Sequence, residues 1–536
     1  MSLSSLKPRG TRRLIYNSDP SNTTGHLSDP TQPEELRDVV RNYAREGNID
    51  TLVQEVFAEA MTMFWRTEKC PYDIRPHHQR MVPMMDDGLM PIEVYIDECH
   101  KQGMEFFAGF RMNDRHGHHP EYFEKLSRET PEWILTDYKP SWSGAPPESH
   151  EFGCSVNYAI PEVRDWLLSI MREVAHRFDV DGIEFNFIRL AECFPKGETA
   201  ESHLIMTDFI RRVREMLDDA EKKKEGTGNR KLILGVRVPQ QLAGCKQMGF
   251  DVPTWIEEGL VGYVAPSDFG YTDINERYED FVSLAREHDC YIYPQIQAQL
   301  SYKSGLLMAP AQYRGAARNF YAAGADGLST HNYFLIWQPT LTKGGGYHDY
   351  SGDDIQKFPD TYPTAMNDLK ELKSPESIAS GDRHYVFLPI WREGHGPSGI
   401  YVREEIVLSR KECGQRDDFR FRVCENFPAE PVLPLTDEGS RLVFFPLDMI
   451  EGDEIEVDIN GTAIPSEHLS WKWPDDDQPP ACSIALSSPP FVYGDNYLGA
   501  KLTESANGAE GDIKIERVEC MVRALPASAG HVSVER

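Results

Sequence analysis

The chain has 536 residues, of which 40% are hydrophobic and 26% charged, a composition typical of folded proteins that bury a core. Its 86 Asp and Glu residues outnumber the 56 Lys and Arg residues, so the formal charge is −30 at pH 7. Because this charge repels nucleic-acid phosphates and anionic membrane surfaces, we expect neither nucleic acid nor a membrane as a partner.

Residues 12 to 373 alternate short apolar runs with amphipathic helical stretches. The predicted strands span residues 13–20, 49–57, 104–114, 180–187, 232–239, 261–268, 291–298 and 326–334. The predicted helices span residues 33–47, 90–103, 161–178, 200–222, 251–258, 274–288 and 309–323. Alternating strands and helices imply parallel pairing, and eight units fit an α/β fold of the (β/α)8 TIM-barrel type. We therefore expect residues 1–374 to form a catalytic barrel domain. The competing open sheet lacks its Gly-rich phosphate loop after the first strand.

Beyond residue 380 the pattern changes to alternating strands without helices. Predicted strands lie within residues 384–391, 399–410, 419–427, 441–448, 453–464, 496–504 and 512–525. Asn460 and Gly461 are typical of the two central residues of a hairpin turn. We therefore expect residues 380–536 to form a smaller all-β domain, a β-sandwich.

The fourth predicted strand carries a carboxylate and an amide, Glu184 and Asn186, on one of its two faces. An ionised carboxylate inside an apolar layer costs several kcal/mol unless it is paired or hydrated. Glu184 is therefore expected to face a polar cavity at the strand end. The alternative is a salt bridge with Arg237 inside the barrel. Asp181 and Asp326 precede glycines at strand starts, on the face that supports stability, and are predicted to be structural.

Active sites of TIM barrels lie at the C-terminal strand ends and the loops that follow them. Long loops at 58–89, 114–158 and 334–360 suggest a deep cleft there, with disordered insertions as the alternative. The strand ends offer Gln54 or Glu55, Asn113 and Ser267 among other polar groups. Amides and carboxylates beside aromatic rings suit a carbohydrate. The predicted substrate-binding residues are Asn17, Asp19, His116, Trp142, Asn186, Arg189, Arg237, Tyr271, Gln295, Gln297, His331, Asn332 and Tyr333.

Hydrolysis of a glycosidic bond needs two carboxyl groups. We predict Glu184 as nucleophile or base and Asp268 as general acid, with Asp114 as the substitute for either role. A carboxyl separation of ~5 to 5.5 Å would mean retention of configuration and ~6.5 to 9.5 Å inversion. Asp268 could instead cap the segment that follows it.

Two histidine-rich stretches raise the question of a metal. RHGHHP contains His116, His118 and His119, and RPHHQR contains His77 and His78. Neither has an HExxH pattern or a cysteine partner, so we expect hydrogen bonding to substrate, with no bound metal and no cofactor.

The passage CSVNYAIPEVRDWLLSIMREVAHRFDVDGIEFNFIR, residues 154 to 189, is similar to the central segment of the family 10-like glycosyl hydrolases, a group of bacterial (β/α)8 proteins. DVPTWIEEGLVGYVAPSDF also resembles that group. The resemblance implies a TIM barrel, often with an attached β-sandwich, and a glycosidase acting on a polysaccharide or oligosaccharide. Members commonly read DGIH or DGIE, then an apolar residue, then Asp, where this chain has Asn186. The role of that Asp is therefore either shifted to Glu184 or lost.

Together these features predict a glycoside hydrolase that acts on an oligo- or polysaccharide by a two-carboxylate mechanism. Arg189, Arg237 and the loop histidines would suit acidic or sulfated sugars. Two alternatives stay open: a carbohydrate lyase or metal-dependent isomerase using the histidine-rich loop, and a glycan-binding barrel without catalysis.

The first residues and the cysteines bear on the cellular compartment of the protein. The first residues lack the apolar run of a signal peptide, and ten cysteines are scattered without paired spacing. We therefore expect a cytoplasmic protein with reduced thiols, although a secreted or periplasmic protein without its leader would look the same. Assembly into a homo-oligomer is left open.

Overall fold

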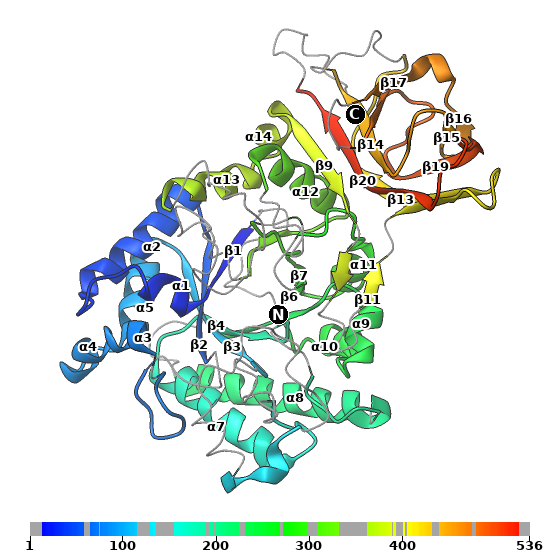
Figure 1. The fold of residues 1–536 in the computed structure, drawn as a ribbon. Coiled ribbons are helices and arrows are strands. Elements are labelled where there is room, and N and C mark those ends of the chain that lie inside the picture. Colours follow the sequence, from blue (N-terminus) through cyan, green and yellow to red (C-terminus); the bar gives the residue numbers. More distant parts are fainter. Residues whose placement is uncertain are drawn as a thin grey trace.

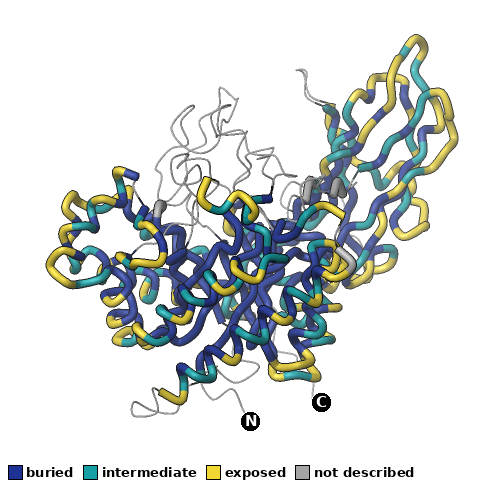
Figure 2. The backbone as a smooth tube through the Cα atoms, turned by 90° about the horizontal axis from the view of Figure 1, so that it is seen from below, coloured by how far each residue is buried: buried dark blue, intermediate teal, exposed yellow. Residues whose placement is uncertain are grey.

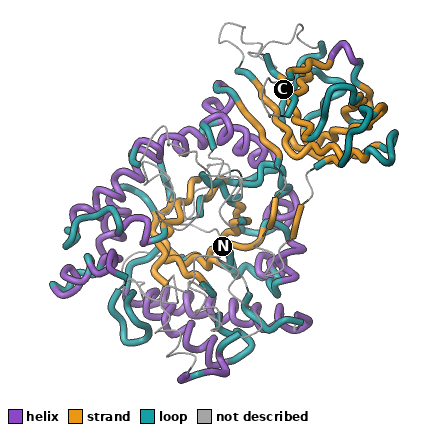
Figure 3. The backbone as a smooth tube through the Cα atoms, viewed as in Figure 1, coloured by secondary structure: helices purple, strands orange, loops and turns teal. Residues whose placement is uncertain are grey.

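The protein is described from a computed structural model. Described are residues 13–57, 65–73, 75–114, 128–135, 155–188, 192–197, 199–223, 231–268, 272–298, 300, 308–331, 362–388, 390–392, 400–402, 405–430, 439–473 and 479–524. Eight parallel strands form one sheet in the order β7-β6-β5-β4-β3-β2-β1-β8, and helices surround it (Figures 1 and 3). The predicted TIM-barrel fold is confirmed, together with antiparallel sheets that follow it.

The barrel strands fall within the eight predicted runs. Their bounds are β1 (Arg13–Ser18), β2 (Thr51–Phe57), β3 (Glu105–Arg111), β4 (Gly182–Asn186), β5 (Ile233–Pro239), β6 (Tyr263–Ser267), β7 (Tyr291–Ile292) and β8 (Gly327–Ser329). β7 is assigned to two residues only, although the N–H groups of Tyr293 and Gln295 still donate to the backbone oxygens of Val264 and Pro266 at 2.9 and 3.1 Å. The sheet closes between β7 and β8 through a single parallel bridge, Gln295 to Ser329.

The helices also follow the sequence pattern. Those of the barrel are α1 (Pro20–Thr24), α2 (Pro33–Gly47), α3 (Pro76–Gln79), α4 (Val82–Asp86), α5 (Pro91–Lys101), α7 (Pro161–Arg177), α8 (Thr199–Lys223), α9 (Leu242–Gln247), α10 (Val252–Glu257), α11 (Glu279–Arg286) and α12 (Pro310–Ala322). After them come α13 (Asn367–Lys370) and α14 (Pro375–Ser380). Proline is the first residue of α2, α5, α7 and α12, where its fixed φ favours a helix start and its missing N–H costs nothing.

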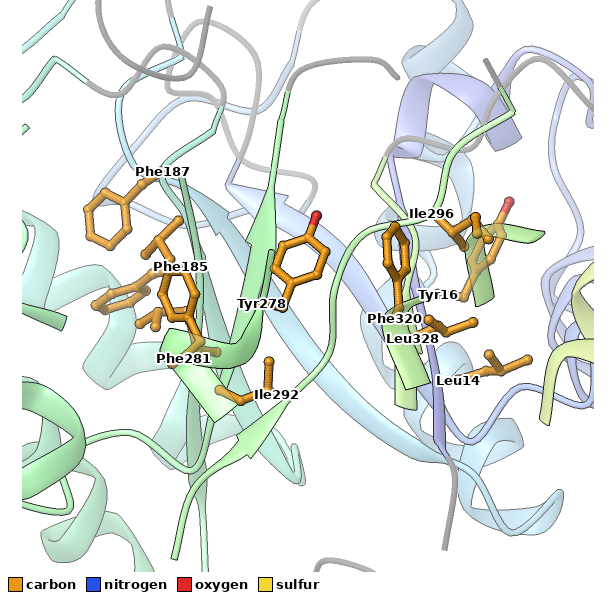
Figure 4. Close-up of a cluster of buried hydrophobic side chains, with 14 of the residues drawn as sticks. Leu14, Tyr16, Phe185, Phe187, Tyr278, Phe281, Ile292, Ile296, Phe320 and Leu328 are labelled. Atoms are coloured by element: carbon orange, nitrogen blue, oxygen red, sulfur yellow. The ribbon is translucent and has the colours of Figure 1, made fainter. Parts of the chain in front are cut away.

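Each barrel strand is buried on both faces (Figure 2). Outward residues pack against the helices, as Phe185 does against Phe209 of α8 with ring centroids 6.3 Å apart. Figure 4 shows this layer, in which Phe185, Phe187, Tyr278 and Phe320 lie between the strands and the helices. Inward residues form a separate apolar cluster: Ile15, Val53, Phe107, Ile233, Tyr263, Ala265, Tyr291 and Tyr293. This cluster fills the barrel below its C-terminal end.

Three aspartates at the N-terminal end of the barrel make the same kind of hydrogen bond to a neighbouring strand. The carboxylate of Asp50, before β2, accepts from the backbone N–H of Leu14 in β1 at 2.9 Å. Asp181, before β4, accepts from Phe106 of β3 at 2.8 Å. Asp326, before β8, accepts from Ile292 of β7 at 2.9 Å. Asp181 and Asp326 therefore have the structural surroundings predicted for them, far from the strand ends that build the site.

Two antiparallel sheets follow the barrel. One contains β9 (Arg383–Phe387), β12 (Ile406–Ser409), β14 (Arg441–Leu447), β17 (Leu469–Lys472), β18 (Ala481–Ala485) and β20 (Asp512–Val522). The other contains β13 (Arg416–Val423), β15 (Glu454–Ile459), β16 (Thr462–Ala463) and β19 (Gly494–Glu504). A short hairpin pairs β10 (Ile390–Arg392) with β11 (Ile400–Val402). β17 and β18 were not predicted.

Details of these sheets agree with the turn chemistry of the sequence. Asn460 and Gly461 join β15 to β16 with positive φ values of 54° and 78°, as the predicted hairpin turn requires. Phe387 of β9 and Phe421 of β13 bring the two sheets together, with ring centroids 5.6 Å apart. The domain boundaries at 374 and 380 stay a prediction.

The antiparallel sheets contact the outside of the barrel through α12 (Figure 1). The amide of Asn319 donates to the backbone oxygens of Ile274 at 3.0 Å and Arg422 at 2.8 Å, and it accepts from the N–H of Cys424 at 3.0 Å. Arg420 donates to the backbone oxygen of Asn275 at 2.6 Å. These contacts place the sheets beside the barrel wall.

Candidate active site

The candidate site lies where the barrel strands end. Side chains from non-neighbouring strands touch one another there, which is only possible inside the barrel. Asn17 of β1 reaches Glu184 of β4, and Asn186 of β4 reaches His331 after β8. The structure thus brings together residues that the sequence placed on one face of each strand.

Glu184 is fully buried and receives hydrogen bonds on both carboxylate oxygens. Asn17 Nδ2 lies 3.0 Å and Arg237 Nε 3.2 Å from Oε1. The Tyr263 hydroxyl lies 2.8 Å and Arg237 Nη2 3.5 Å from Oε2. All of these groups are donors, so they hold the carboxylate in one orientation and match its negative charge.

Two glycines leave room for this arrangement. Gly109 and Gly235 flank Glu184 on the neighbouring strands. A Cβ at Gly235 would lie 2.0 Å from Cζ of Tyr263, and a Cβ at Gly109 would lie 3.1 Å from Cγ of Glu55. The missing side chains thus allow Tyr263 and Glu55 to occupy the barrel interior.

Arg237 links Glu184 to the other side of the barrel. Its Nη1 lies 2.8 Å from the hydroxyl of Ser267 and 3.3 Å from that of Ser329. The salt bridge between Arg237 and Glu184, foreseen as the alternative to an open cavity, is therefore present. Burial, and then Glu184, raise the pKa of Tyr263 well above its usual value, so its hydroxyl remains a donor at neutral pH.

A second buried arginine, Arg111 of β3, gathers three carboxylates beside this group. Its nitrogens lie 2.5 Å from Asp19, 2.5 Å from Glu55 and 2.8 Å from Asp114. Burial is the largest influence and opposes the charge of Arg111, but the three carboxylates outweigh it and raise its pKa well above the usual value. Asp114, the predicted substitute catalyst, is thus bound to Arg111.

Asn186 connects the second group to the eighth strand. Its Nδ2 lies 2.8 Å from Oε1 of Glu55 and 3.0 Å from Nε2 of His331, while its Oδ1 accepts from the N–H of Ile188 at 3.0 Å. The position at which the family resemblance led us to expect Asp is therefore a bridge between a carboxylate and an imidazole.

The sixth and seventh strands supply the remaining predicted residues. Asp268 follows β6 and is buried, and its backbone oxygen accepts from Gln295 Nε2 at 2.7 Å. Gln297 donates to the backbone oxygen of His331. Hydrogen bonds from both amides to the backbone support the strand ends. Asn113 supports the following loop, because its side chain binds the backbone of Val156 and Glu192.

The histidine-rich stretches contribute less than their spacing suggested. His78 is buried against Arg75, with Nε2 2.8 Å from Nη2, and its Nδ1 lies 3.1 Å from the hydroxyl of Thr24. Across the described ranges, no three His, Cys, Asp or Glu side chains are arranged to hold a metal ion. The stretch with His116, His118 and His119 lies outside the described residues.

Five other predicted binding residues also lie outside the described part of the chain, namely Trp142, Arg189, Tyr271, Asn332 and Tyr333. Sequence reasoning overlooked Arg111 and Tyr263, and it named Glu55 only as one of two choices. The alternation of side-chain direction along FFAGFR, residues 106–111, could have identified Arg111, because Arg111 shares a strand face with Phe107 and Gly109.

Comparison with known proteins agrees with the resemblance found in the sequence. Residues 21–196 match the model of the family described as "Glycosyl hydrolase-like 10". The chain is 28% identical over 173 residues to the protein named "Glycosyl hydrolase DigH" of Escherichia coli strain K12, and the same values hold for that of Shigella flexneri. This match covers 30% of this chain and 36% of those relatives. The resemblance to the family is thus confirmed over the part of the barrel that carries Glu55, Arg111, Glu184 and Asn186.

Two solved structures that match this chain have low sequence identity to it. An endo-beta-1,4-mannanase from Thermotoga petrophila is 11% identical with a TM-score of 0.44, and the match covers 98% of this chain and 100% of the mannanase. An alpha-L-fucosidase isoenzyme 2 from Paenibacillus thiaminolyticus is 12% identical with a TM-score of 0.40, over 69% of this chain and 51% of the fucosidase.

Among the residues that the structure describes, no helix is both long enough and apolar enough to cross a membrane.

Proposed function

We propose that the protein is a glycoside hydrolase that cleaves an oligo- or polysaccharide at the C-terminal end of its barrel. The observation that carries this proposal is the orientation of Glu184 by Asn17, Arg237 and Tyr263. A carboxylate held by donors from three different strands is pre-organised for one position at a reacting centre, which is what catalysis by positioning requires.

In this proposal Glu184 is the nucleophile or base and Asp268 the general acid. Both residues belong to strand ends of the same barrel, two strands apart. Asp114 is the substitute for either role, and Arg111 engages its carboxylate at 2.8 Å. The remaining polar residues, Asn17, Asp19, Asn186, Gln295, Gln297 and His331, are proposed to line or support the sugar site.

The charge of the sugar is a finer part of the proposal. Arg237 is engaged by Glu184, Ser267 and Ser329, so we assign it to positioning Glu184 instead of binding an anionic sugar. The proposal that the sugar is acidic or sulfated then depends on Arg189 and His116, whose side chains can carry a positive charge.

A screen of polysaccharides with detection of new reducing ends tests the proposal, run in parallel on the wild type, Glu184→Gln and Asp268→Asn. Each variant should lower turnover by about 10²-fold or more, since each removes an acid, base or nucleophile. Glu105→Gln is the matched control, because Glu105 is a barrel glutamate paired with Arg13 at 2.8 Å outside the proposed site. Wild-type rates in both site variants would contradict the assignment.

A glycan-binding barrel without catalysis is the second candidate. It is favoured by the amide at Asn186, where relatives commonly carry a carboxylate. This candidate predicts that an oligosaccharide binds to the wild type and protects it from thermal unfolding while no polysaccharide in the screen is cleaved.

A further inference from the structure

Only one of the two orientations of the Asn186 side-chain amide is compatible with its hydrogen-bond partners. Its Oδ1 receives the N–H of Ile188 at 3.0 Å, and its Nδ2 faces the carboxylate oxygen of Glu55 at 2.8 Å. Turning the amide over would place Oδ1 against the Glu55 carboxylate and Nδ2 against an N–H. Both contacts would then be repulsive, so two partners other than His331 decide which atom is the nitrogen.

This orientation determines the hydrogen-bond role of His331. The Asn186 nitrogen that donates to Glu55 also lies 3.0 Å from Nε2 of His331. An amide nitrogen only donates, so Nε2 must accept with its lone pair. A histidine whose Nε2 accepts is neutral and carries its ring proton on Nδ1.

We propose that Asn186 is a positioning residue that keeps His331 neutral, with its proton on Nδ1. A neutral His331 carries no positive charge for pairing with a carboxylate or sulfate, so this end of the barrel suits an uncharged sugar better than an anionic one. This substrate preference rests on the proposed function. The protonation state of His331 does not, since it follows from the contacts of Asn186.

A carboxylate at position 186 would reverse this arrangement. It would lie beside Glu55 and would accept from Nε2 of His331, so the ring would gain a partner for its second proton. Other charged groups surround the same barrel end, and their combined field acts on the ring in either variant: Asp19, Glu55, Arg111, Asp114, Glu184, Arg237 and Asp268. Exchanging Asn186 for Asp changes the group in contact with Nε2 of His331 and also replaces the donor to Glu55 by a carboxylate.

The test is imidazole ¹⁵N NMR of the protein labelled at histidine, recorded without substrate between about pH 5 and 8, the range in which histidine normally titrates. His331→Gln identifies the signal among the 17 histidines. In the wild type His331 should show the neutral Nδ1–H form throughout the range. In Asn186→Asp it should titrate within the range or remain an imidazolium.

Asn17→Asp is the matched control, because it adds the same charge at the barrel end, next to Glu184. It should leave the neutral Nδ1–H form of His331 in place. The proposal is overturned if wild-type His331 titrates near about 6.5, or carries its proton on Nε2, or if Asn17→Asp alters it as Asn186→Asp does.

The polysaccharide screen separates this proposal from the proposed function. A neutral His331 in a protein that cleaves no polysaccharide would uphold the role of Asn186 and reject the hydrolase. For a sugar that is cleaved, Asn186→Asp should add a new ionisation to the pH profile of kcat/KM, which a purely structural residue would not do.

Discussion

Glu184 and Arg237 face each other from neighbouring strands of the barrel, with Arg237 Nε 3.2 Å from Glu184 Oε1 and both side chains fully buried. A buried ion pair is costly to break, because the remaining charge is left buried without its partner. The pair also connects the proposed catalytic carboxylate to Ser267 and Ser329. Its removal should therefore affect both stability and activity.

Arg237→Met leaves Glu184 without its cationic partner and should lower the free energy of unfolding by about 3 to 5 kcal/mol. Adding Glu184→Gln to this variant should recover part of the loss, because the uncompensated charge is gone. Chemical denaturation followed by fluorescence and circular dichroism measures both variants. Equal losses in the single and the double variant would show that the charge of Glu184 is not the cause.

Gly235→Ala should displace Tyr263 from Glu184. The added Cβ would lie 2.0 Å from Cζ of the ring and 2.4 Å from its hydroxyl, so the ring must move. We expect a loss of about 1 to 3 kcal/mol in unfolding free energy and a fall in any glycosidase activity. Tyr263→Ala removes the obstructing atoms, so Gly235→Ala should cost less stability when made in that background. An unchanged cost would refute the clash.

Stability should fall at alkaline pH because of buried tyrosines. Burial is the largest cause that raises the pKa of Tyr263 and Tyr385, in each case followed by a nearby glutamate. A hydroxyl whose pKa is raised by folding contributes stability that is complete below its unfolded pKa of about 10 and is lost as pH rises above it. Each such group steepens the loss by about 1.4 kcal/mol per pH unit.

Urea unfolding at several pH values between about 8 and 11.5 measures this dependence on both sides of the unfolded tyrosine pKa. Tyr385→Phe should make the alkaline decline shallower than in the wild type. Tyr497→Phe is the control, because Tyr497 is 44% exposed. A decline that does not change in Tyr385→Phe would exclude that hydroxyl as a source.

Asp181→Ala should destabilise the N-terminal end of the barrel. It removes the acceptor of the Phe106 N–H and the partner of His100, whose Nε2 lies 2.8 Å from Oδ2. Leaving a buried N–H without an acceptor costs about 1 to 3 kcal/mol. Asp179→Ala is the control two residues earlier, since its side chain is 66% exposed and 3.9 Å from His100. Equal effects of the two substitutions on unfolding would contradict the role of Asp181.

The barrel was predictable because its signals are local. Every strand lies inside an apolar run bounded by turn residues, and proline marks the start of four long helices. β7 was predicted too long, since the pattern YIYPQIQA continues beyond Ile292, where the structure has backbone hydrogen bonds from Tyr293 and Gln295 but no assigned strand. β17 and β18 were missed, although β17 pairs with the strand that follows it, and β18 also pairs with β14.

The candidate site was only partly predictable, and the physical reason lies in how its residues meet. Alternation along the fourth strand determined that Glu184 and Asn186 share one face, because the side-chain direction has a period of two. The strand order placed Asn17 and Arg237 at other strand ends of the same barrel. Only the tertiary structure decided their partners. Arg111 of β3 meets Asp19 and Glu55 from the first two strand ends, and Asn186 meets His331 after 145 residues. Such pairs depend on strand order and closure of the barrel, which a local pattern does not contain.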